Sequence, residues 1–237
     1  MRTVLLVFAI TLFNTSVWAG ISLTGTRVIY PANEVSVNVY MSNQTDKPAL
    51  AQVWTDNGDP KVIPAAKDNP FLLTPPVSRV NAKANQVVRL MLKQNMNMAQ
   101  DRESLYWFNL LDIPALSKAD ADKNILQFSV RSRLKLFYRP TNLSMTQKDA
   151  FKSVTFTQQL GQKSIEISNP SPYYITFDRL NFKPVTGKDI VYGGDVMVAP
   201  FASQSISMKP FDVPLQQVSY EVINDLGGNE AFEADIR

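Results

Sequence analysis

Short stretches in which polar and apolar residues alternate recur along most of this chain, and they constrain its fold more than any other feature. In residues 35–40 the alternation places Val35, Val37 and Val39 on one face of an extended strand. No segment shows a long 3.6-residue period, so we expect an all-β protein. Further strand patterns, separated by Gly, Pro, Asn and Asp clusters, cover residues 49–55, 87–92, 105–110, 124–138, 154–156, 164–168, 173–177, 205–208 and 218–223.

Two successive sets of strands divide the chain. The strand pattern pauses around residues 139–142, and a second, shorter set follows. The residues after position 19 suffice for one large domain or for two of roughly 100 residues each. Because short strands at this spacing are typical of β-sandwiches, we expect two sandwiches, one over residues 20–140 and one over residues 141–237.

The first 19 residues have the pattern of a secretory signal peptide. Arg2 precedes a short apolar run over residues 4–10, and the small residue Ala19 stands before Gly20. Polar residues interrupt the run soon afterwards, so it is too short for a stable membrane span. We expect cleavage after Ala19 and an exported, soluble protein; a retained N-terminal anchor is the alternative.

The residue types that the chain lacks narrow its chemistry. It has no Cys and no His, which excludes disulfides, Ser-His-Asp and Cys-His nucleophiles, and His-ligated zinc. The formal net charge of +3 is too small for nucleic-acid binding, for which dense basic clusters are expected. We therefore expect no enzyme activity, no metal, no cofactor and no nucleic-acid partner.

The residues offer little support for two functions of other classes. A hydrolase with paired carboxylates needs them roughly 5–10 Å apart in a cleft, whereas Asp56 and the other aspartates of the turn-rich segment 56–68 are expected to lie in a solvated loop. A carbohydrate-binding sandwich could use Trp54, Trp107 and Tyr173, but both tryptophans lie in strand patterns typical of cores.

For five residues of the two basic and apolar strand segments, the local pattern alone predicts ordinary structural roles. Leu126, Phe128 and Val130 share one face of a strand, and the apolar face of such a strand usually packs inward. Arg27 and Lys135 are single charges within β-rich stretches, and such charges are usually solvated. Nothing in the composition says that the two cations meet.

Seven sequence blocks, taken together, are far more specific than any one of them. The blocks are GTRVIY (25–30), LTPPVSR (73–79), DRESLYWFN (101–109), IP (113–114), RLKLFYRP (133–140), NPSPYY (169–174) and INDLGG (223–228). With these blocks in this order, the chain resembles the periplasmic chaperones of chaperone–usher pili, and the resemblance extends over essentially all of residues 20–237.

The resemblance implies a fold and a function. The fold is two immunoglobulin-like β-sandwich domains set as an L, with a cleft between them. The function is to bind and stabilise pilus subunits in the periplasm and to deliver them to an outer-membrane usher without ATP. Self-association of the free protein stays open. A fibre subunit, the nearest rival, would have a single incomplete sandwich and commonly a Cys pair.

The resemblance also assigns roles to residues of the cleft and of the strand before it. Arg27 and Lys135 would bind the C-terminal carboxylate of the subunit. Leu126, Phe128 and Val130 would enter a groove that the subunit leaves open because it lacks one strand, an interaction called donor-strand complementation. Strict alternation puts Lys135 on the opposite face from Leu126, so we expect a bend or bulge between Val130 and Lys135.

Two further features follow from the resemblance. Glu103, Arg139 and Asp225 match a salt-bridge network between the domains. The loop over residues 114–124 is short, as in the short-loop subclass that serves rod-type and related pili. Independently of the resemblance, the Thr74-Pro75-Pro76 run predicts a rigid turn, which a cis bond at one of its prolines can accommodate.

Overall fold

The computed structural model describes residues 20–62, 64–65, 68–94, 96–116, 124, 126–159, 161, 163–207 and 213–237. The expected signal peptide, residues 1–19, and most of the 114–124 loop that supports the subclass prediction lie outside the described residues. Within the described ranges, no helix is long and apolar enough to cross a membrane.

The N-terminal half forms a sandwich of two sheets. Apolar residues alternate along each strand because one face of each sheet packs against the other sheet. The Thr74–Pro75 peptide bond, between two of the strands, is cis. One sheet has the order β1 (Ile21–Leu23), β3 (Val37–Asn43), β7 (Asn85–Leu92) and β5 (Phe71–Thr74), and the other the order β2 (Arg27–Pro31), β9 (Val130–Arg139), β8 (Ser104–Pro114), β4 (Ala49–Asp56) and β6 (Val77–Val80).

The C-terminal half repeats this architecture. It begins with the short helix α1 (Gln147–Lys152), whose first turn is capped by Thr146 because the Thr146 hydroxyl accepts a hydrogen bond from the Asp149 amide. One sheet contains β10 (Thr155–Gln159), β11 (Ser164–Asn169) and β15 (Ala202–Ser207), and the other β13 (Ile190–Tyr192), β12 (Ile175–Pro184), β16 (Leu215–Ile223) and β17 (Asn229–Asp235), with β14 (Val196–Val198) also paired to β12.

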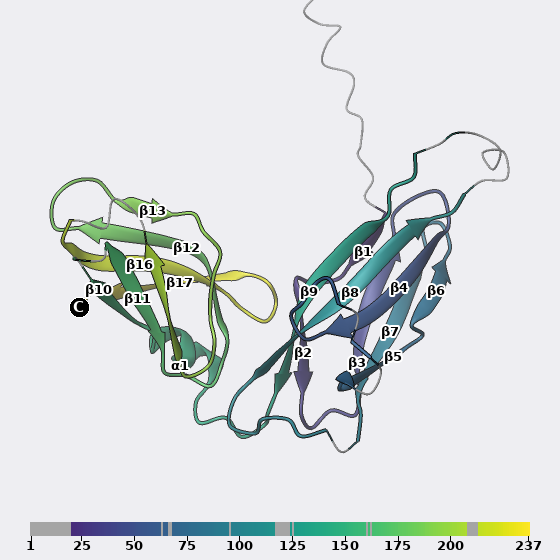
Figure 1. The fold of residues 1–237 in the computed structure, drawn as a ribbon, viewed down its shortest axis with the longest axis horizontal. Coiled ribbons are helices and arrows are strands. Elements are labelled where there is room, and N and C mark those ends of the chain that lie inside the picture. The colour runs from purple at the N-terminus through teal and green to yellow at the C-terminus, as the bar shows by residue number, and fades with distance from the viewer. Residues whose placement is uncertain are drawn as a thin grey trace, which may run out of the picture.

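Each sandwich has its own hydrophobic core. The N-terminal core includes Tyr30, Phe108 and Leu136, and its buried residues all lie between Ile21 and Tyr138. A second cluster, which includes Phe156 and Phe182, lies entirely in the C-terminal half. The expected all-β architecture with two sandwiches is therefore confirmed. Figure 1 shows the two sandwiches set at an angle, with the hairpin between β16 and β17 pointing toward the N-terminal sandwich.

Strand β9 differs from the expected strand in two ways. It begins at Val130, so the strand predicted from residue 124 is wrong for the described residues 124 and 126–129. The register between β8 and β9 is also continuous from Asp112–Val130 to Ser104–Tyr138. The expected bulge is therefore absent from this ladder. Lys135 lies on the opposite face from Leu134 and Leu136 simply because strand side chains alternate.

Candidate functional site

Two basic side chains meet where the sandwiches face each other. Strands β2 and β9 run parallel, and their register places Arg27 directly beside Lys135. Both side chains are partly buried, and both reach the C-terminal sandwich. Arg27 Nη1 donates a hydrogen bond to the Ile223 carbonyl at 2.9 Å, and Lys135 Nζ donates one to Thr176 Oγ1 at 3.3 Å. Residues 108 positions apart in the sequence thus form one cationic site.

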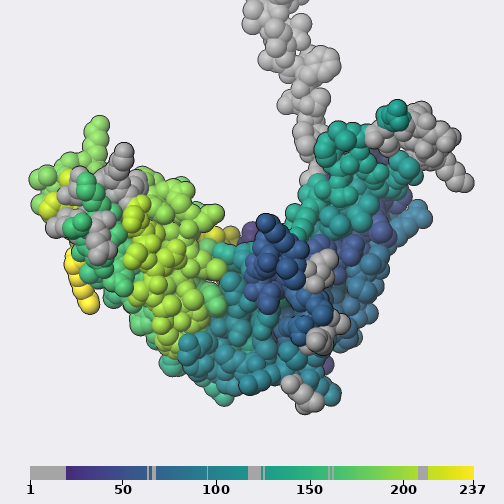
Figure 2. All heavy atoms as spheres, viewed as in Figure 1, coloured from purple at the N-terminus to yellow at the C-terminus, as the bar shows by residue number. Residues whose placement is uncertain are grey.

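The two cations line a cavity of about 350 Å³ between the sandwiches. Thr26 and Trp107 contribute to its wall from the N-terminal side, and Asp178 and Asn229 from the C-terminal side. The hollow between the two halves is visible on the molecular surface in Figure 2. The site is therefore built from both domains and is open to a ligand from outside.

The electrostatics of this site favour an anion. Burial lowers the pKa of Lys135, and the charge of Arg27 lowers it further. Burial also lowers the pKa of Arg27, against the opposing charges of Asp225 and Glu103. Arg27 Nε is buried without a hydrogen-bond partner, and the ion pairs found among the described residues include neither cation. A carboxylate placed here would satisfy the free donor and relieve the repulsion.

A second charged cluster joins the two sandwiches. Arg139, the last residue of β9, donates to Glu103 Oε1 at 2.7 Å and binds Asp225 through both terminal nitrogens, at 2.6 and 2.8 Å. Glu103 also accepts a hydrogen bond from the Tyr174 amide at 2.8 Å. The Arg139 guanidinium lies 5.2 Å from the centre of the Tyr173 ring. These contacts tie the end of β9 to two loops of the C-terminal sandwich.

The pKa values of the two acids bound to Arg139 shift in opposite directions. Burial raises the pKa of Glu103 although Arg139 and the Tyr174 amide oppose it. For Asp225 burial acts in the same sense, but hydrogen bonds from Arg139 and Gln147 outweigh it and lower the pKa. Asp225 is the more exposed of the two, with 31 % of its side chain accessible against 2 % for Glu103. The deeper burial of Glu103 therefore accounts for the opposite pKa shifts of the two acids.

The apolar residues before the cleft are exposed. Leu126 is 80 % accessible, Phe128 68 % and Val130 58 %. Strand β2 pairs with β9 only from Lys135 onward, so the opposite edge of residues 130–134 has no partner strand among the described residues. Large apolar side chains beside a free strand edge are a binding or aggregation surface, since natural proteins otherwise protect such edges. The inward-packing reading of these three residues is wrong for this structure.

Comparison with known proteins decides the family. Residues 20–144 match the description "Pili and flagellar-assembly chaperone, PapD N-terminal domain", and residues 149–234 match "Pili assembly chaperone PapD, C-terminal domain". The chain belongs to the PapD family of pilus-assembly chaperones. Its relatives include the chaperone protein MrkB of Klebsiella pneumoniae, 38% identical over 92% of this chain and 91% of MrkB.

Solved structures of PapD-family chaperones share the fold. The crystal structure of the Escherichia coli chaperone YadV superposes with a TM-score of 0.78 at 34% identity, covering 92% of this chain and 100% of YadV. A Salmonella enterica SafB chaperone, solved in complex with the SafA pilin, superposes with a TM-score of 0.72 at 27% identity over 91% of this chain and 96% of the compared chain.

Sequence reasoning missed a buried ionic cluster at the start of β9. The Asp56 side chain is completely buried, so its expected place in a solvated loop is wrong. Arg133 binds both of its oxygens, at 2.6 and 3.2 Å, and Asn109 donates to it at 2.8 Å. Arg131 lies 3.5 Å from Asp56 Oδ2. The sequence contained one sign of this cluster: Arg131 and Arg133 stand two positions apart, so their side chains share one face of the strand.

Both tryptophans belong to the same cluster. Arg133 lies 4.0 Å from the centre of the Trp107 ring, and Arg131 lies 4.9 Å from that of Trp54. These cation–π contacts cover the outer face of the sheet, so the expectation that Trp54 and Trp107 are core residues is wrong. The cluster fixes the first half of β9 to β4 and β8, directly after the exposed residues 126–130.

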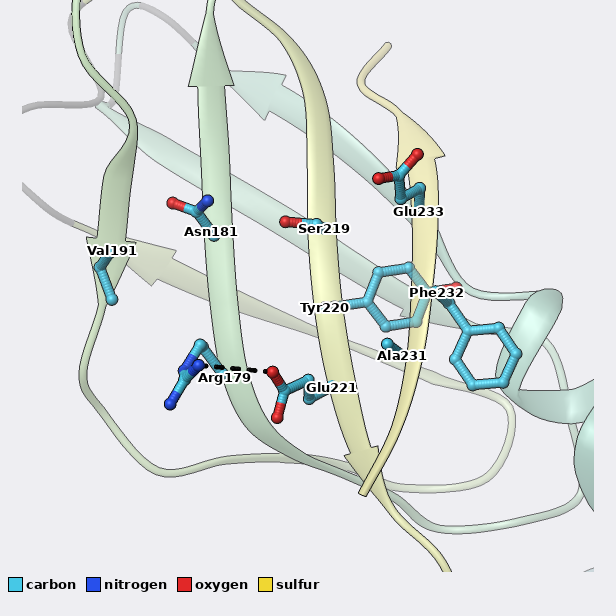
Figure 3. A pocket seen from close by; sticks show the side chains of 9 residues that line it. All are labelled: Arg179, Asn181, Val191, Ser219, Tyr220, Glu221, Ala231, Phe232 and Glu233. Atoms are coloured by element: carbon cyan, nitrogen blue, oxygen red, sulfur yellow. Dashed lines mark hydrogen bonds and ion pairs between the residues drawn. The ribbon is translucent and has the colours of Figure 1, made fainter.

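A wider hollow on the C-terminal sandwich offers no comparable chemistry. It measures about 910 Å³ and lies on the sheet face formed by β13, β12, β16 and β17. Figure 3 shows its ion pair between Arg179 and Glu221. The two side chains lie 3.4 Å apart, and that of Arg179 is 61% exposed. Exposed ion pairs of this kind contribute little to stability. Among the described residues no cluster of acidic side chains could hold a metal ion.

Proposed function

We propose that this chaperone acts in the periplasm, where it holds a pilus subunit by its C-terminal carboxylate and completes the subunit's fold with its own β9 edge before delivery to an outer-membrane usher. The observation that carries the proposal is the pair Arg27–Lys135: two adjacent cations, a free buried donor and no carboxylate partner among the described residues. The related chaperone SfaE, 30% identical, is described as periplasmic.

The carboxylate and the free edge define one binding path. Lys135 lies five residues beyond Val130 on β9, about 17 Å along an extended strand. A subunit strand that runs along this edge and ends at Lys135 must run parallel to β9. Its main chain would then pair with the free edge, and its C-terminal oxygens would meet Arg27 and Lys135.

The exposed apolar residues supply the second part of the interaction. Burying Leu126, Phe128 and Val130 in a subunit groove would contribute about 1.5–3 kcal/mol for each side chain. Association costs about 4–15 kcal/mol in lost freedom of motion. The apolar residues alone do not reliably exceed that cost, so main-chain pairing and the carboxylate contacts are needed as well. In this proposal no ATP is consumed, because a better-fitting strand of the next subunit can replace β9.

Capture of subunits from the periplasm tests the proposal. Wild-type protein is co-expressed with the pilus subunits encoded nearby and compared with Lys135→Ala and with Lys183→Ala, which removes an exposed lysine of β12. We expect the wild type and Lys183→Ala to retain the subunit and Lys135→Ala to lose it without unfolding. Equal capture by all three proteins would refute the carboxylate site, and no capture by the wild type would refute these subunits as partners.

A further inference from the structure

Asp112 has a carboxylate oxygen with no hydrogen-bond donor among the described residues. The residue lies in β8 and is only 6% exposed. Its Oδ2 accepts a hydrogen bond from the Ile21 amide at 2.8 Å, while Oδ1 is buried and unpaired. A buried carboxylate oxygen without a donor is costly. The position therefore calls for a further positively charged or strongly polar partner.

The main chain at Gly20 lies directly against this carboxylate. A Cβ atom at position 20 would lie 1.7 Å from Asp112 Oδ2, so any residue with a side chain would displace the acid. Gly20 is held in place because its carbonyl accepts a hydrogen bond from the Gln44 amide at 3.3 Å and because Ile21 pairs with Asn43. Gly20 and Asp112 together border two hollows of about 330 and 500 Å³.

We propose that Asp112 binds the α-ammonium group of the mature chain. Hydrolysis of the Ala19–Gly20 peptide bond by a signal peptidase adds one water across it, leaving a carboxylate on Ala19 and an ammonium on Gly20. The uncleaved chain has one neutral N–H at Gly20, whereas the cleaved chain has a charged group with three donors. The ammonium thus supplies the donor that Oδ1 lacks.

Two of the other charged residues bordering the two hollows have partners of their own. Asp46 pairs with Lys83 at 3.2 Å and is largely exposed. Arg133 is bound by Asp56. Lys47 is an exposed cation beside the same hollow, but it does not bond Asp112 Oδ1, which has no partner among the described residues. Asp112 is therefore the acid best placed for the new terminus.

The position of this pair links processing to the subunit site. Asp112 is the register partner of Val130, the first residue of β9. An ion pair between Gly20 and Asp112 would fix β1 beside the start of the strand that binds the subunit. A precursor that keeps its signal segment cannot form this ion pair, so its N-terminal sandwich would lack the contact until after export and cleavage.

A four-protein comparison tests the coupling. The wild type, Asp112→Asn, a chain with two extra residues ahead of Gly20, and the two changes combined are purified from periplasm, and their first residues are verified by intact mass. We expect each single change to lower the Tm. In the extended chain, Asp112→Asn should lower the Tm much less than it does in the wild type. Equal cost of Asp112→Asn in both chains, or a wild-type chain that does not begin at Gly20, would overturn the proposal. Asp46→Asn is the control and should show no coupling.

The reactivity of the terminal amine gives a second readout that does not depend on stability. An ion pair that raises the pKa of an α-amine by one unit removes about nine-tenths of its reactive free base near neutral pH. We therefore expect acylation at Gly20 to be roughly tenfold slower in the wild type than in Asp112→Asn, as followed by mass spectrometry of the N-terminal peptide. Equal rates in the two folded proteins would contradict an ion pair.

Discussion

At the scale of single residues, the cleft holds two like charges side by side. Arg27 and Lys135 are register partners on β2 and β9, and burial lowers the pKa of each. Desolvation and mutual repulsion both disfavour the charged forms. A site of this kind binds an anion well because the anion relieves costs that the free protein carries. Because these costs depend on the charge of Lys135, subunit binding should depend on pH.

Subunit affinity should fall at alkaline pH. Because the free Lys135 has a lowered pKa and a bound carboxylate would raise it, binding is strongest while Lys135 is protonated. Affinity should therefore be constant below the pKa of free Lys135 and decrease as the pH rises through it, before ordinary lysines titrate near 10.4. Lys135→Arg should remove this dependence, since arginine stays charged. Measured Kd values that rise equally in both proteins from neutral to alkaline pH would contradict the assignment.

Asp225 should stabilise the protein at neutral pH and lose this effect in acid. Arg139 binds it through two nitrogens and its pKa is lowered, so its contribution is present above the unfolded-state pKa and disappears as the pH falls through the native one. We expect Asp225→Asn to reduce the free energy of unfolding by about 1.5–3 kcal/mol at neutral pH. Urea unfolding at several pH values measures this.

The control for Asp225 is an exposed acid. Asp101 pairs with Arg102 at 2.6 Å on the surface, and such pairs contribute little. Asp101→Asn should therefore leave the unfolding free energy nearly unchanged. A difference in unfolding free energy between wild type and Asp225→Asn that grows as the pH falls would contradict the proposed role of Asp225.

Glu103 depends on pH in the opposite sense. Its pKa is raised, so its proton is held more tightly in the folded protein than in the unfolded chain.

At the scale of elements, strand β9 places its side chains in three different environments. Leu136 and Tyr138 pack in the core, Arg131 and Arg133 cover the outer tryptophans, and Lys135 faces the cleft. The alternation of strand side chains makes this division without any bulge. The residues before Val130 then leave the sandwich and expose their apolar side chains.

Phe128→Glu should weaken subunit capture and leave the Tm unchanged. Phe128 is 68 % exposed in the free protein, so a charge there breaks no core contact, whereas a charge in an apolar groove is strongly unfavourable. Ser129→Glu adds the same charge to the next, also exposed, residue, which should face away from the groove, and should have a smaller effect. Thermal unfolding and co-purification measure both quantities. A large fall in Tm for Phe128→Glu would show that the side chain packs within the chaperone.

The sequence predicted most strands but not their limits. Alternation located β3, β4, β7 and β16, because each has one buried face and one exposed face. It extended β9 back to residue 124, because an apolar alternation looks the same whether its partner is the protein's own core or another chain. Helix α1 was missed because six residues are too few to show a helical period.

The candidate site needed more than local pattern. Arg27 and Lys135 are brought together by a parallel pairing between distant strands, which periodicity does not specify, and the family resemblance named them instead. The burial of Asp56 also depends on two arginines from a distant strand. Local composition around Asp56 is that of a turn, so tertiary contacts alone account for its burial.

At the scale of the whole molecule, the two sandwiches are coupled through the end of β9. Each has a separate core. The contacts between them include the hydrogen bonds from Arg139 to Asp225 and the packing of Phe137 on Tyr174, whose ring centres lie 5.6 Å apart. The cleft and its two cations depend on this joint, since Arg27 and Lys135 each bond a residue of the other domain.

If the cleft binds a subunit's C-terminal carboxylate, the affinity must depend on that group. The most direct test measures Kd for one subunit in two forms, with a free C-terminal carboxylate and with a C-terminal amide. Because a charge-assisted hydrogen bond contributes about 1.5–3 kcal/mol, we expect the wild type to bind the amide at least roughly tenfold more weakly. We expect no such difference for a chaperone that carries both Arg27→Ala and Lys135→Ala. Equal affinity of the wild type for the two forms would contradict carboxylate binding in the cleft.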